Sequence, residues 1–135
     1  MGYKMMIAAL VLVVSSMASA SYAGLELTAQ QQQSILDNLN NICGDAWCEG
    51  EYELNFVSIR FREERGVPQY VLSIVAHDSY MDRNQAPRIN FECVVKDVQV
   101  IQEMVNPNAI HPMSYLEHKL YQNVDDCVLD NLYKK

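Results

Sequence analysis

Apolar residues recur at helical spacing in the segment that follows residue 28. This stripe consists of Ile35, Leu36, Leu39 and Ile42. Thr28 precedes the segment and Gln31 lies three positions later, which is the spacing of a capping box. Gly44 suits the position after the last turn, because glycine adopts a left-handed conformation there at little cost. The pattern therefore predicts a helix over residues 29–43.

Alternation of apolar and polar residues replaces the helical pattern in the next segment, residues 52–61. The alternation changes phase within this segment: Leu54 and Phe56 share one face, whereas Val57 and Ile59 share the other. One extra residue in a strand shifts every later side chain to the opposite face. We therefore expect a strand with a bulge or a sharp twist near Phe56.

Two further strands complete an antiparallel meander. Residues 63–68 suit a hairpin turn, and residues 69–76 form a strand that is apolar on both faces, which indicates a central position in the sheet. The polar residues 77–88 form a long connection to the third strand. The apolar residues of that strand are Ile89, Phe91, Cys93 and Val95.

Two helices are predicted after the third strand. Val98, Ile101 and Met104 suit a short helix, although Val98 and Val100 would also suit a strand. A second capping box at Ser114 and Glu117, followed by an apolar stripe, predicts a long helix over about 115–132. The order is N-terminal helix, three-stranded antiparallel meander, short helix and long C-terminal helix. It predicts an α+β two-layer sandwich with helices on one face of the sheet.

The start of the chain has the features of a signal peptide. A positively charged residue precedes an unbroken apolar run over residues 5–14, and small residues follow. Ten apolar residues make a helix of about 15 Å, half the hydrocarbon thickness, so we expect no membrane anchor after cleavage. Cleavage after Ala20 or Ala23 fits the small-residue rule, and Ala23 is preferred. We therefore expect residues 1–23 to be a signal peptide and residues 24–135 to be one extracytoplasmic domain. That domain would be periplasmic in a Gram-negative bacterium and secreted otherwise.

The expected mature chain is acidic. Without the leader, nine Lys and Arg stand against 17 Asp and Glu, a net charge of −8. Nucleic acids and anionic lipid surfaces need a positively charged protein surface, so the sign argues against both as partners. A basic protein partner is compatible with it, and solubility alone would also explain the charge.

Four cysteines in an oxidising compartment predict two disulfides, with three possible pairings. The favoured pairing joins Cys43 to Cys48 and Cys93 to Cys127, because the loop that contains Gly44 can turn tightly. Four residues separate the first two cysteines, whereas zinc sites and thioredoxin-like redox pairs use two. We therefore expect no metal and no cofactor.

The segment 43–53, with the sequence CGDAWCEGEYE, is the most unusual part of the chain, because it combines the only tryptophan with several acidic residues. The candidate binding residues in it are Asp45, Trp47, Glu49, Glu51, Tyr52 and Glu53. A disulfide across the segment would present an aromatic side chain among carboxylates, which suits a basic protein partner. The alternative is that Trp47 fills the core. The three glutamates alternate, so in a continuous strand their carboxylates would line one face about 7 Å apart.

The connection 77–88 is a second candidate recognition surface through Tyr80 and Arg83, because long loops often carry function. His77 beside Asp78 is the best candidate for a general base, although neighbours on a strand point to opposite faces. The chain has neither a G-x-S-x-G nucleophile elbow nor a glycine-rich phosphate loop. We therefore assign no catalytic residue.

These observations predict a small exported binding protein, of the kind that inhibits or confers immunity to a basic enzyme acting on the cell envelope. Two alternatives stay open. One is a small-ligand-binding or hydrolytic envelope protein with a pocket between sheet and helices. The other is a structural or assembly factor of the envelope.

Overall fold

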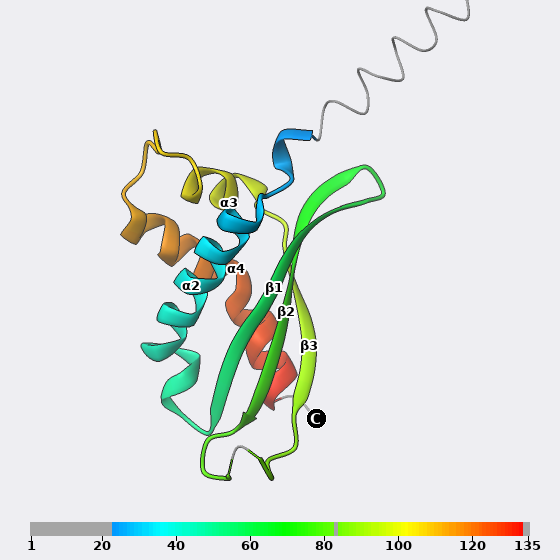
Figure 1. Cartoon of the computed structure of the whole chain (residues 1–135), viewed down its shortest axis with the longest axis vertical. Coiled ribbons are helices and arrows are strands. Elements are labelled where there is room, and N and C mark those ends of the chain that lie inside the picture. The colour runs from blue at the N-terminus through cyan, green and yellow to red at the C-terminus, as the bar shows by residue number, and fades with distance from the viewer. Residues whose placement is uncertain (1–22, 83, 134–135) are drawn as a thin grey trace, which may run out of the picture.

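The structure is a computed structural model that describes residues 23–82 and 84–133. Its elements are η1 (Ala23–Leu25), α2 (Ala29–Gly44), η2 (Trp47–Glu49), β1 (Tyr52–Glu64), β2 (Val67–Asp78), β3 (Ile89–Val95), α3 (Val98–Met104) and α4 (Met113–Tyr133). This order confirms the predicted α+β fold, including the short helix after the third strand (Figure 1). The expected signal peptide lies outside the described residues, apart from its last residue.

The sheet is an antiparallel meander in the order β1-β2-β3, which confirms the central position of the second strand. The register passes from Phe56 opposite Ile74 to Ser58 opposite Ser73, so Val57 is the extra residue of a bulge. Because the bulge shifts the phase, Phe56 before it and Ile59 after it both reach the core. The phase change in the sequence is therefore explained.

The turn between β1 and β2 is tighter than predicted. Both strands extend toward it, and only Arg65 and Gly66 remain between them. Their φ angles are 52° and 79°, the positive values of a two-residue type I′ turn, whose twist matches that of the flanking strands. The hairpin tip projects past the helices (Figure 1).

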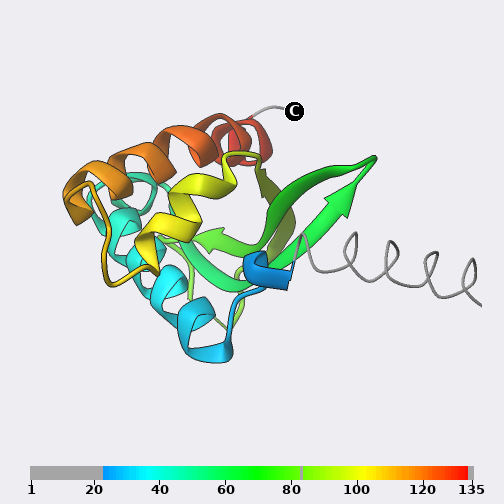
Figure 2. The same ribbon diagram turned by 90° about the horizontal axis from the view of Figure 1, so that it is seen from above.

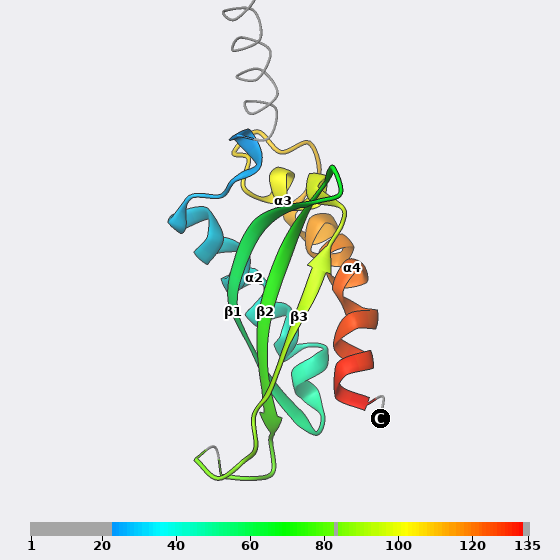
Figure 3. The ribbon, with the colours of Figure 1, turned by 90° about the vertical axis from the view of Figure 1, so that its right-hand side faces the viewer.

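The three α-helices of the described residues, α2, α3 and α4, lie on one side of the sheet (Figure 2). α2 packs mainly against β1, and α4 packs against β3 (Figure 3). The side chains that fill the space between the layers include Ile35, Leu39, Ile59, Leu72, Ile74, Ile101, Leu116 and Leu120, each almost completely buried. The two layers therefore share one hydrophobic core.

The helix ends agree only in part with the sequence patterns. The capping box of α2 is confirmed: Thr28 Oγ1 accepts the Gln31 N–H at 3.1 Å, and Gln31 Oε1 accepts the Thr28 N–H at 2.9 Å. Gly44 is the last residue of α2 and not the residue after it, so its predicted role is wrong. The second capping box is also wrong. The carbonyl of Pro112 already accepts the N–H groups of the first turn of α4, so the helix begins before Ser114 becomes available as a cap.

Two disulfides connect elements of the fold. Cys43 is bonded to Cys48 and joins the end of α2 to η2, whereas Cys93 is bonded to Cys127 and joins β3 to α4. This is the pairing that the cysteine spacing favoured. Sequence separations of 5 and 34 residues make the first a local closure and the second a long-range link between the two layers.

Candidate functional site

Trp47 lies in the core and is only 6% exposed. Its ring stacks on Tyr121 of α4 with 5.0 Å between centroids and meets Phe56 of β1 at 5.7 Å. Its Nε1–H donates to Asp125 Oδ1 at 2.8 Å, which satisfies the polar edge of the indole. The alternative given above, in which Trp47 fills the core, therefore describes the structure. The side chain fastens the 43–53 segment to α4 and is not displayed on the surface.

The three alternating glutamates do not share a strand face. Glu49 belongs to η2, Glu51 precedes β1, and only Glu53 lies in the strand. The continuous strand that would align the three carboxylates is not formed, because the chain turns through a 3-10 helix just before β1 begins. Tyr52 is half-buried against Tyr133 of α4, with 5.6 Å between ring centroids.

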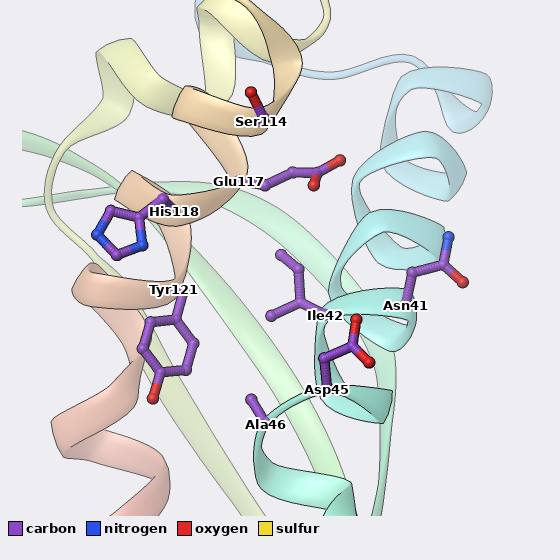
Figure 4. A pocket seen from close by; sticks show the side chains of 8 residues that line it. All are labelled: Asn41, Ile42, Asp45, Ala46, Ser114, Glu117, His118 and Tyr121. Carbon is purple, nitrogen blue, oxygen red and sulfur yellow. The ribbon is translucent and has the colours of Figure 1, made fainter.

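Two adjoining pockets lie between two walls. One wall is formed by α2 and the 43–53 segment, and the other is formed by α4. The first, which we call the α2–α4 pocket, has a volume of about 410 Å³ and is lined by Asn41, Ile42, Asp45, Ala46, Ser114, Glu117, His118 and Tyr121 (Figure 4). The second has a volume of about 240 Å³ and is lined by Ala46, Trp47, Gly50, Tyr121, Asp125, Leu129, Leu132 and Tyr133. Ala46 and Tyr121 line both, so the two pockets adjoin at these residues, and we call the pair the groove.

Carboxylates from both sides face the α2–α4 pocket. Glu117 of α4 and Ile42 of α2 point into the space between the helices, and Asp45, which follows the last residue of α2, lines the α2 side of the pocket (Figure 4). His118 points away from this space (Figure 4). Burial and the neighbouring Asp125 carboxylate raise the pKa of Tyr121, so its hydroxyl stays neutral near pH 7. Lys and Arg do not occur among the described residues that line either pocket.

A separate and larger cavity, about 800 Å³, lies at the β1 side of the sheet. It is lined by Asn40, Gly44, Cys48, Glu53, Leu54, Asn55, Val57, Val75, His77 and Arg88. His77 Nε2 lies 2.7 Å from Glu53 Oε2, and the His77 side chain is 15% exposed. The antiparallel register places these two residues directly opposite each other.

The structure separates His77 from its sequence neighbour. Asp78 does not line this cavity, and its Oδ1 accepts the Tyr80 N–H at 2.8 Å. The carboxylate partner of His77 is therefore the cross-strand Glu53. Asp78, the neighbour in sequence, is not the partner because successive residues of a strand face opposite sides of the sheet.

The second candidate surface, the 77–88 connection, is only partly described. Tyr80 is 83% exposed and lines none of these cavities. Arg83 lies outside the described residues.

Sequence reasoning missed the contribution of α4. Glu117, Tyr121 and Asp125 follow one another at helical spacing beside the apolar stripe of this helix. Polar residues at the border of an apolar stripe are the ones that reach a neighbouring element, and this was the available signal. It does not indicate which element they meet.

In the part of the chain that the structure describes, no group of three or more His, Cys, Asp or Glu residues is arranged to hold a metal ion. Over the same residues, no helix is both long and apolar enough to cross a membrane. Comparison of the chain with known protein families, with curated proteins and with solved structures gave no match.

Proposed function

We propose that this is an exported binding protein that docks its helical layer on a basic surface of another protein, as an inhibitor or immunity protein does. The observation that carries the proposal is the unequal distribution of charge between the two layers. The groove beside the 43–53 segment is the concave part of that layer.

The helical layer, residues 29–49, 98–104 and 113–133, contains eight carboxylates and one lysine. The carboxylates are Asp37, Asp45, Glu49, Glu103, Glu117, Asp125, Asp126 and Asp130, and none is buried. The strands and their hairpin turn contain five carboxylates and three arginines. Negative charge is therefore concentrated on the helical layer, where it attracts a basic surface and speeds association with it.

The disulfides support the same proposal. Two disulfides in a small domain are compatible with an oxidising, extracytoplasmic compartment. The Cys43–Cys48 bond and the buried Trp47 hold the groove wall in place before any partner arrives. Such preorganisation reduces the entropy lost on binding.

Reversal of two charges on the helical layer tests the proposal. We expect the Asp45→Lys, Glu49→Lys double variant to capture at least about tenfold less of its partner from an envelope extract than the wild type, because attraction becomes repulsion. The measurement is mass spectrometry of the proteins retained at moderate salt. Activity of the retained protein, titrated with the wild-type chain, then tests inhibition.

The matched control carries the same change in net charge elsewhere. Glu63 in the hairpin and Asp97 after β3 are exposed, so the Glu63→Lys, Asp97→Lys variant should fold and capture the partner as the wild type does. Equal losses in both double variants would mean that overall charge governs retention, which contradicts a specific helical face.

A small-ligand-binding function is the second candidate, and the His77–Glu53 pair in the largest of the cavities described here favours it. Among the described residues that line this cavity, Cys48 is disulfide-bonded and supplies no thiol nucleophile. We expect small polar compounds screened by NMR to perturb the His77 ring signals and to lose this effect in His77→Gln. A screen in which no compound perturbs these signals would contradict this candidate.

A further inference from the structure

We propose that the α2–α4 pocket receives a single arginine side chain of the partner. The residues that line the pocket carry this inference. The inference rests on the proposed function only for the statement that the arginine belongs to a protein.

The shape and lining of the pocket match a long side chain with a charged end. Its volume of about 410 Å³ is within the range of ligand pockets. Ile42 and Ala46 supply apolar surface, while Asp45 and Glu117 stand on opposite sides of the space between the helices (Figure 4). An arginine places its methylene stem on apolar surface and its charged head against carboxylates.

The two carboxylates are available for such a head group. Within the described part of the chain, neither Asp45 nor Glu117 has a hydrogen-bond or ion-pair partner for its side chain. Lys119 is close in sequence to Glu117, but its Nζ lies over the Tyr115 ring, 5.6 Å from the centroid. An incoming cation therefore displaces no internal partner from either carboxylate.

Arginine fits this arrangement better than lysine. A guanidinium presents donors along two edges of a plane and can meet two carboxylates on opposite sides, whereas an ammonium is a compact point charge. Guanidinium groups also stack on aromatic rings, and the Tyr121 ring lines the pocket. That ring is held in place by its stacking on Trp47.

The test uses one short peptide and its neutral analogue. Acetyl-Gly-Arg-Gly-amide is titrated into the purified, oxidised, ¹⁵N-labelled protein, and the same titration is made with citrulline in place of arginine. We expect the arginine peptide to shift the amide signals of the pocket residues with a Kd of about 1 mM, and the citrulline peptide to bind at least about tenfold more weakly. A lysine peptide should bind about threefold more weakly than the arginine peptide.

One variant and one matched control localise the binding. Glu117→Gln keeps the shape of the side chain and removes its charge, so it should weaken binding of the arginine peptide about fivefold. Asp126→Asn removes the same charge from an exposed position of α4 that does not line the pocket, and should change the affinity less than about twofold. Both variants are expected to fold, because neither side chain has a structural partner in the described chain.

Equal binding of the citrulline peptide, shifts confined to another surface, or equal effects of the two substitutions would each overturn the proposal. Its failure can be told apart from failure of the proposed function. If the peptide does not bind but charge reversal still abolishes partner capture, docking through the helical layer is supported and the arginine pocket is contradicted. If the peptide binds as expected but charge reversal leaves partner capture unchanged, the arginine pocket is supported and the proposed function is contradicted.

Discussion

Trp47→Ala will lower the free energy of unfolding by about 3–5 kcal/mol, the range for removing a large aromatic side chain from a core. The ring packs between Tyr121 and Phe56, and its loss leaves a cavity where the 43–53 segment meets α4. Trp47→Phe keeps much of the ring but leaves Asp125 without its indole donor, so we expect a loss of about 1–3 kcal/mol. Urea unfolding followed by far-UV circular dichroism measures both values.

Tyr80→Ala provides the control, because the Tyr80 ring is 83% exposed. A surface truncation of this kind changes stability by no more than about 0.5 kcal/mol. If Trp47→Ala unfolded like the wild type and yet lost the partner, Trp47 would be a binding residue and its place in the core would be contradicted.

The two disulfides will contribute unequally to stability. In the chain-entropy account, a cross-link adds more to the free energy of unfolding when it closes a longer loop of the unfolded chain. For sequence separations of 34 and 5 residues this predicts about 4 kcal/mol for Cys93–Cys127 and about 2 kcal/mol for Cys43–Cys48. Urea unfolding of the two double alanine variants, each with one pair removed, measures the difference.

Thiol titration of the unfolded variants serves as the control that the remaining disulfide is intact. An equal or larger loss on removal of Cys43–Cys48 would contradict the prediction. It would mean that this bond stabilises the native groove directly, and not through the unfolded chain.

These results bear on how the 43–53 segment contributes to binding. Its tryptophan holds the segment to α4 and its disulfide holds it to α2, and in the proposed function the exposed Asp45 and Glu49 carboxylates meet the partner. A partner-binding assay on Trp47 variants therefore reports folding as well as recognition. The charge variants at Asp45 and Glu117 avoid this problem, because those side chains make no internal contact that the fold requires.

Local patterns in the sequence were enough to predict the helices, the strand order and even the bulge near Phe56. A period of 3.6 or 2 residues reports which side chains face the core, and a change of phase reports an extra residue. Cysteine spacing favoured the observed disulfides for a similar reason, since a short loop restricts which partners can meet. Each of these features depends on residues close together in the chain.

The candidate site was decided by tertiary structure. Trp47 meets Asp125, 78 residues later in the chain, and Asp45, in the turn after α2, lines the same pocket as Glu117 of α4. His77 pairs with Glu53 and not with Asp78 because the register of β1 and β2 places them opposite each other. Periodicity shows that a side chain points inward or outward, but not which distant element it meets. That depends on how the helical layer packs against the sheet, and only the folded chain determines it.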